Sequence, residues 1–171
     1  MKTLNIELIA LDLEVCDRCG GTLANLKAAI RAATPALRTL GLEPALRETL
    51  VESLEQTERL RFASSPTIRI DGREIMGTPR ESACVACTDL SGGEDDIDCR
   101  VWPWRGTAHD AAPVGLIVEA LMRAALAPEA PALAPEWSGV PANIRAFLAG
   151  RASRANAVAG NQSCCGSSCG K

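Results

Sequence analysis

The stretch LNIELIALDLEVCDRCGGTLANLKAAIRAA, residues 4–33, indicates the fold class most directly. Residues 4–13 first alternate between apolar and polar side chains and then become almost wholly apolar, as expected of a strand covered on both faces. From Leu23 onward, apolar residues recur at spacings of three and four, which predicts a helix that ends near Pro35 or Gly41. The stretch therefore predicts a strand followed directly by a helix.

The pair Cys16 and Cys19 lies at this junction between strand and helix. At a helix N-terminus, unpaired backbone N–H groups and the positive end of the helix dipole stabilise a thiolate. Arg18 can add a cation, whereas Asp17 opposes it. We therefore predict a redox dithiol in which Cys16 attacks and Cys19 resolves.

Two other interpretations of this pair stay open. Because Gly20 and Gly21 follow it, the motif also resembles half of a zinc site, where glycine lets the backbone turn around the metal. The next cysteine, however, is 65 residues beyond Cys19, which is far longer than zinc-ribbon spacing. Inert buried thiols are the third interpretation. Asp12, four residues before Cys16, accepts the proton of Cys19 if it is buried beneath the pair; otherwise it is exposed or paired with Arg18.

Composition limits the function classes. The 171 residues are 47% hydrophobic and carry a net charge of -3, so we expect one domain plus a tail, with no nucleic-acid or membrane partner. The N-terminus lacks the pattern of an export signal, so we expect a cytoplasmic protein, in which eight cysteines serve catalysis or metal binding rather than a disulfide framework. The single histidine, His109, argues against a serine hydrolase.

The remaining pattern predicts further elements. Residues 45–53 are expected to form a second strand and residues 54–62 a short helix. Residues 67–75 form the clearest hairpin, because Asp71-Gly72 suits a tight turn. Residues 113–126 are expected to form the last helix, with a proline at its start.

This order resembles the thioredoxin fold. Residues 4–126 are similar to a thioredoxin-like domain in which Cys16 and Cys19 match the redox motif and Pro66 matches the cis-proline that faces it. More narrowly, the motifs CDRC, SSPTIRIDGREI, SACVAC and DCRVW resemble an uncharacterised bacterial thioredoxin-like family. The resemblance implies dithiol chemistry with Cys16, Cys19 and Pro66 at the catalytic site and no required cofactor. Unlike thioredoxin itself, the chain has no Trp before the dithiol and no Gly-Pro within it.

An insertion at residues 77–112 precedes the last helix and contains Cys84, Cys87, Cys99 and His109. One interpretation is a Cys3His zinc site. Another is a second dithiol that exchanges electrons with the first pair, and a third is loosely packed thiols. Under either functional interpretation, the three cysteines must lie in one cluster.

The C-terminal part changes composition. Residues 127–160 are rich in proline and alanine and are expected to form a linker or surface strap, with a short helix at residues 142–148. Residues 161–171 form a flexible tail with Cys164, Cys165 and Cys169, three thiols suited to a soft metal or metalloid ion. A resolving redox tail and an incidental end are the alternatives.

The sequence thus predicts an α/β protein with a thioredoxin-like domain at residues 1–126 and a cysteine-rich tail. Its expected function is that of a thiol-disulfide oxidoreductase linked to soft metal or metalloid handling, such as mercury, arsenic or copper. Its expected partners are a thiol reductant or disulfide substrate and a soft ion. The alternative is a non-catalytic protein that binds a metal, or is stabilised by zinc, through the same thiols.

Overall fold

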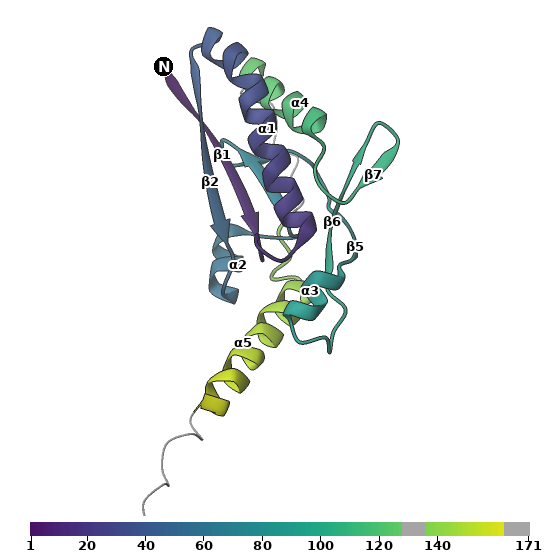
Figure 1. Ribbon diagram of the computed structural model, residues 1–171. Coiled ribbons are helices and arrows are strands. Elements are labelled where there is room, and N and C mark those ends of the chain that lie inside the picture. Colours follow the sequence, from purple (N-terminus) through teal and green to yellow (C-terminus); the bar gives the residue numbers. More distant parts are fainter. Residues whose placement is uncertain (128–135, 163–171) are drawn as a thin grey trace, which may run out of the picture.

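A computed structural model describes residues 1–127 and 136–162 of the chain, which form a mixed α/β structure (Figure 1). The first sheet has the strand order β2-β1-β3-β4. Strand β1 (Lys2–Ala10) pairs in parallel with β2 (Leu42–Leu50) and antiparallel with β3 (Thr67–Ile70), which continues into β4 (Arg73–Glu74). The expected strand, second strand and hairpin are all present, and β2 begins three residues earlier than predicted.

Helices α1 (Asp17–Thr39) and α4 (Val114–Leu126) lie side by side over one face of this sheet (Figure 1). Helix α2 (Leu54–Leu60) follows β2. Helix α1 continues through Pro35 instead of ending there, and the chain then turns at Gly41, whose φ of 77° suits glycine.

The insertion has a structure of its own. A second sheet has the order β5-β6-β7, formed by Arg80–Ala83, Asp98–Trp104 and Thr107–His109. The short helix α3 (Val85–Leu90) connects β5 to β6 and packs against α5 (Ala142–Gln162). Within the insertion, the backbone N–H of Arg100 donates to the carbonyl of Ser65 at 2.6 Å, and the Arg100 guanidinium lies 3.2 Å from the Glu74 carboxylate. These contacts fasten the insertion to the first sheet.

Helix α5 is longer and better anchored than the short helix expected at residues 142–148. Ile144 and Phe147 are fully buried, and the Asn143 side chain exchanges two hydrogen bonds with the backbone of Asp98. Residues 151–159 are exposed, and alanine and arginine there favour helix by intrinsic propensity. This segment is therefore a packed part of the fold and not only a linker.

The buried side chains fall into two groups. The sheet core lies between the first sheet and helices α1 and α4. Its members are mostly aliphatic and include Leu4, Ile6, Leu8, Leu26 and Ile117. The cysteine core joins the C-terminal end of β1 to the insertion and α5, and contains Cys16, Cys19, Cys84, Cys87 and Cys99 together with Phe62 and Phe147.

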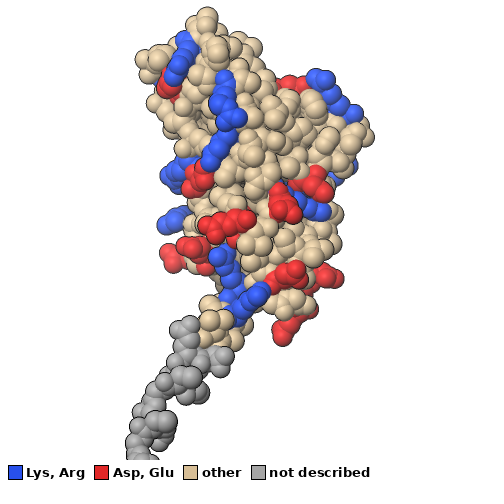
Figure 2. Space-filling model, viewed as in Figure 1, with Lys and Arg blue, Asp and Glu red and all other residues tan. Residues whose placement is uncertain are grey.

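Charged groups of both signs are interspersed on the face shown in Figure 2, without an extended patch of one sign. Within residues 1–127 and 136–162, no helix combines the length and the apolar character needed to cross a membrane.

Candidate metal centre

Four cysteine sulfurs meet in the cysteine core. The Sγ atoms of Cys16, Cys84, Cys87 and Cys99 all lie within 4.8 Å of one another. Cys16 Sγ is 3.8 Å from Cys84 Sγ and 3.5 Å from Cys87 Sγ, and Cys99 Sγ is 3.2 Å from Cys87 Sγ. All four side chains are at most 5% exposed, and all are free thiols. The predicted clustering of the three insertion cysteines is confirmed, and Cys16 joins them.

Cys16 is positioned by a capped loop between β1 and α1. The carboxylate of Asp12 accepts hydrogen bonds from the backbone N–H groups of Glu14, Val15 and Cys16, at 2.6–3.0 Å. Cys16 then serves as the N-cap of α1, and the first helical hydrogen bond runs from Gly20 N–H to its carbonyl. Asp12 is therefore buried, as one interpretation required, and its carboxylate holds the loop, while Arg18 pairs with Asp110 instead.

Cys84 and Cys87 are placed by the start of α3. Cys84 is the N-cap of that helix, and its backbone N–H donates to the carbonyl of Ile97 at 2.8 Å. Cys87 lies one turn later on the buried side. Cys99 comes from β6, where it pairs with Ser82 of β5. The loop before α1 thus supplies one sulfur, the start of α3 supplies two, and strand β6 supplies one.

Arg18 lies between Cys16 and Cys19 in the sequence and joins the start of α1 to the insertion. Its guanidinium donates to the carbonyls of Ser82, Ala83 and Cys99 at 3.1–3.3 Å. The same guanidinium lies 3.1 Å from the carboxylate of Asp110. Arg18 therefore binds the backbone next to Cys84 and Cys99, a role that the sequence did not indicate, because its local pattern places Arg18 only as a cation near Cys16.

Cys19 is a fifth buried thiol at the edge of this group. It is fully buried, and its Sγ lies 3.4 Å from Ser65 Oγ. Ser65 Oγ also accepts a hydrogen bond from the backbone N–H of Leu11 at 3.1 Å. The Ser65-Pro66 peptide bond is cis, as predicted, and Pro66 is buried next to the residue that contacts Cys19.

The thiols set one another's acidity. Hydrogen bonds from Cys19, Cys84, Cys87 and Cys99 hold the pKa of Cys16 far below its ordinary value. The direction agrees with the prediction for Cys16, but the main cause is the neighbouring thiols. The same contact with Cys16 raises the pKa of Cys19 to about 12 and also raises the pKa values of Cys87 and Cys99.

The pKa of Cys84 responds to opposing contacts. Cys16 raises it, but hydrogen bonds with Cys87 and Cys99 outweigh this contact and bring it to about 7. The backbone N–H of Cys87 also donates to the Cys84 sulfur and favours its thiolate. The contacts within the cluster thus favour a thiolate at Cys16 and Cys84 and protonated thiols at Cys19, Cys87 and Cys99.

Other predicted residues lie elsewhere. His109 is in β7, with its ring 6.4 Å from that of Trp104, and it is not part of the four-cysteine group, so the Cys3His ligand set was wrong. Cys16 takes the fourth position because the fold brings the start of α1 against the insertion. Cys164, Cys165 and Cys169 lie outside the described residues.

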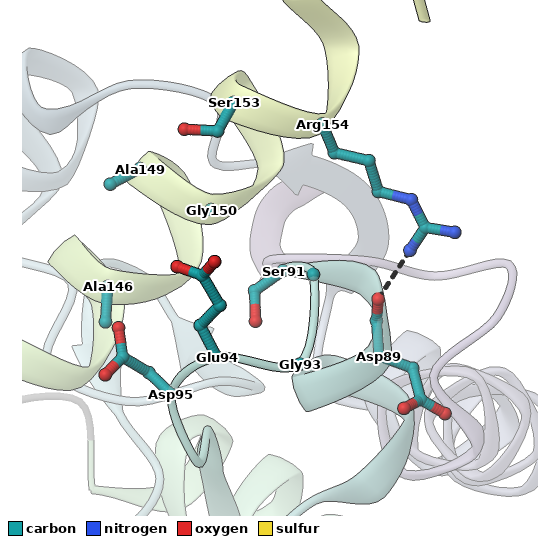
Figure 3. A pocket seen from close by; sticks show the side chains of 11 residues that line it. Asp89, Ser91, Gly93, Glu94, Asp95, Ala146, Ala149, Gly150, Ser153 and Arg154 are labelled. Atoms are coloured by element: carbon teal, nitrogen blue, oxygen red, sulfur yellow. Dashed lines mark hydrogen bonds between the residues drawn. The ribbon is translucent and has the colours of Figure 1, made fainter. Parts of the chain in front are cut away.

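A separate hollow of about 780 Å³ lies between helix α5 and the loop that follows α3 (Figure 3). Asp89, Glu94, Asp95 and Arg154 contribute to its wall, and Arg154 donates to the backbone carbonyl of Asp89. None of the described residues lining it is a cysteine, so the hollow is distinct from the candidate metal centre.

Comparison with known proteins identifies one family. Residues 4–121 match the model of a domain of unknown function, DUF2703. The chain belongs to this family. No curated protein and no solved structure matches the chain. The matched region of this DUF2703 protein contains Cys16, Cys19, Cys84, Cys87 and Cys99, and therefore the whole four-cysteine group.

Proposed function

We propose that this protein binds one metal ion through Cys16, Cys84, Cys87 and Cys99. The observation that carries the proposal is the convergence of four buried sulfurs from three separate parts of the chain. Thiolates are ligands for soft and borderline ions, and four of them form a tetrahedral set. Without an ion, four thiols buried together have only one another as weak hydrogen-bond partners. A metal ion instead binds all four sulfurs.

Zinc fits this arrangement. Sulfur atoms at the corners of a tetrahedron with zinc–sulfur bonds of about 2.3 Å lie about 3.8 Å apart. Three of the sulfur–sulfur distances, 3.2, 3.5 and 3.8 Å, are close to this value, so small side-chain movements accommodate the ion. Four protein ligands leave no open coordination position, which is typical of zinc that stabilises structure or is stored.

Arg18 supports the charge of such a site. Four thiolates around a divalent ion carry a net charge of about -2, and burial makes that charge costly. The Arg18 side chain is 16% exposed and binds the carbonyl of Cys99, so it brings a positive charge beside the sulfurs. Asp110 opposes part of this effect, but its side chain is 71% exposed and therefore well screened by solvent.

We propose further that residues 1–126 form a thioredoxin-like domain. Two features support this proposal: the strand order β2-β1-β3-β4 with one parallel pair, and a CxxC pair at the start of the helix that follows β1. In this proposal the insertion has made the first cysteine of the pair a metal ligand. The free thiols suit a reducing compartment such as the cytoplasm.

Elemental analysis of anaerobically purified protein tests the metal proposal. The full-length chain with Cys164, Cys165 and Cys169 replaced by serine isolates the candidate centre from the tail thiols. We expect one zinc per chain, and loss of most of it in Cys99→Ser. The matched control is Cys19→Ser, which removes a buried thiol outside the four-sulfur group and should keep the metal. Equal zinc content in Cys99→Ser and the parent contradicts the proposal.

A second candidate function is thiol-disulfide exchange through Cys16 and Cys19. The observation in its favour is that Cys16 is the N-cap of α1 and Cys19 lies one turn later beside Ser65 Oγ. A thiol reductant and a disulfide substrate are its partners. Catalytic turnover of a small disulfide by metal-free protein, lost in Cys16→Ser, tests it. Rates equal to those of free thiol at the same concentration exclude it.

Copper, mercury and arsenite are alternative ions for the same thiolates. Soft ions bind thiolate more tightly than zinc does, so they should displace zinc from the four-sulfur group. Competition titrations of the zinc-loaded protein, with Cys84→Ser as the comparison, rank these ions. Displacement that is unchanged in Cys84→Ser assigns soft-ion binding to other thiols.

A further inference from the structure

We infer that Cys16 is shared between two mutually exclusive states, a metal-bound state and a Cys16–Cys19 disulfide, so that oxidation of the pair releases the metal. This inference rests on the proposed metal function and adds its regulation. The geometry behind it is that five buried thiols surround a site that needs four. One sulfur cannot both ligate the ion and form a disulfide, because a disulfide sulfur is no longer a thiolate.

Cys19 is in the right place to be the partner of Cys16. The two residues are three positions apart in the first turn of α1, so their side chains lie on the same face of the helix. Both residues are buried in the cysteine core. Cys19 lies outside the group of four sulfurs, and its Sγ has Ser65 Oγ as a neighbour at 3.4 Å. A thiol that is buried beside the centre but free of the metal is available for exchange.

Disulfides within the four-sulfur group are less favourable, and among the pairings of Cys19 the one with Cys16 closes by far the shortest loop. Cys84, Cys87 and Cys99 are all members of the four-sulfur group, so any disulfide among them removes two ligands at once. Oxidation of Cys16 with Cys19 removes only one ligand and uses a thiol that the metal does not need. The structure therefore favours this pair as the first to oxidise.

The oxidant in this scheme is a small disulfide, RSSR. The Cys16 thiolate attacks one sulfur of RSSR, so that a Cys16–SR bond forms, the S–S bond of RSSR breaks and RS⁻ leaves. The first RS⁻ takes up the proton of Cys19, and the Cys19 sulfur attacks Cys16, so that the Cys16–Cys19 bond forms and a second RS⁻ leaves. Two protein thiols are oxidised, and one RSSR is reduced to two thiols.

Loss of Cys16 leaves three ligands on the ion, Cys84, Cys87 and Cys99, all of them from the insertion. The part of the site contributed by α1 is then disconnected, and the ion passes to an external chelator. Reduction of the disulfide by an external thiol restores the fourth ligand. The burial of the four sulfurs, at most 5% exposed, favours a small disulfide over a protein disulfide as oxidant.

The test uses the zinc-loaded full-length chain in which Cys164, Cys165 and Cys169 are replaced by serine. We add 2-hydroxyethyl disulfide, follow zinc release with a chromogenic chelator, and map disulfides by peptide mass spectrometry. We expect one zinc released per Cys16–Cys19 disulfide formed, and rebinding after reduction. In Cys19→Ser, the Cys16–SR adduct has no resolving thiol and RS⁻ reverses it, so in an excess of 2-mercaptoethanol over the disulfide we expect at least about tenfold less zinc release than from the parent.

The outcomes separate this inference from the proposed function. Absence of zinc from the reduced parent overturns the metal site and the switch together. Zinc present in both reduced proteins, but released to the same extent from Cys19→Ser in that excess of thiol, overturns the switch and leaves the metal site standing. Release from the parent through a Cys84–Cys87 or Cys87–Cys99 disulfide also overturns it. The disulfide map of the parent decides the matter even if Cys19→Ser folds poorly.

Discussion

The sheet core and the cysteine core differ in what holds them together. The sheet core contains aliphatic side chains from β1, α1 and α4, together with Trp102, and none of its described members is a cysteine. The cysteine core contains five thiols and is assembled from the ends of elements: the end of β1, the starts of α1, α3 and β6, and the first turns of α5. Burial of apolar surface is enough to stabilise the first core, whereas the second needs its sulfurs satisfied.

The two cores therefore differ in how far their packing alone can stabilise them. A helix or strand that contributes a long apolar face packs without help from a ligand. Helix α3 has six residues, and Cys87 is its buried residue, so it offers little apolar area of its own. In our proposal, a metal ion that joins α1, α3 and β6 would compensate for this deficit. The following predictions test whether the two cores are separable in this way.

Removal of the metal should have the largest effect. A ligand present at about a thousandfold above its Kd stabilises the folded state by about 4 kcal/mol, so chelation should lower the Tm by roughly 8–16 °C. Hydrogen exchange should show that amides of α3, β5 and β6 lose protection while those of β1 keep theirs. Uniform loss of protection across both cores would show that the sheet core and the cysteine core unfold as one unit.

Leu26→Ala should break the sheet core and leave the metal site intact. Leu26 is fully buried in α1, and truncation of such a side chain costs about 2–5 kcal/mol. Urea unfolding of the zinc-loaded variant measures this cost, and elemental analysis should still find one zinc. A variant that loses zinc in proportion to its stability would show instead that the two cores are coupled.

Arg18→Gln should weaken metal binding with a smaller effect on folding. Arg18 donates hydrogen bonds to the carbonyls of Ser82, Ala83 and Cys99, and loss of such supporting contacts costs about 10–100-fold in metal affinity. Arg18→Lys keeps the positive charge but lacks the planar guanidinium with its several donors, so it should recover part of the affinity. Zinc competition titrations measure both variants.

The matched control for Arg18 is Arg38→Gln near the other end of α1, where Arg38 pairs with Glu43 on the surface. It should bind zinc as the parent does. If both arginine variants lose affinity equally, the contacts of Arg18 with the insertion are not what supports the site.

Gly150→Ala should give the smallest effect, and its sign is informative. In an exposed helix this change stabilises by about 1 kcal/mol, because glycine is a poor helix former. Here the added Cβ would lie 2.0 Å from the backbone carbonyl oxygen of Ser91, at the end of α3, so we expect net destabilisation by about 1–3 kcal/mol. Asn156→Ala, at an exposed position of α5, is the control and should be neutral or slightly stabilising in thermal unfolding.

Local sequence was enough to specify most of the secondary structure. Alternation and apolar runs located β1, helical spacing located α1 and α4, and Asp71-Gly72 located the turn between β3 and β4. These features follow from neighbours a few residues apart, which is the range over which periodicity and turn chemistry act. The same local logic found two CxxC pairs and placed Cys16 at the start of a helix.

Which sulfurs meet depends instead on how distant segments pack. Cys16 and Cys84 are 68 positions apart, yet their Sγ atoms lie 3.8 Å apart, and the spacing argument had counted against a zinc site at Cys16 without excluding it. That argument considered distance along the chain, whereas a ligand set depends on distance in space. Arg18, the Arg100 contacts with Ser65 and Glu74, and the docking of α5 fix the insertion against the first sheet. Such contacts join distant segments, so no local pattern records them, and they bring Cys16 to the three insertion cysteines as the fourth member of the cluster.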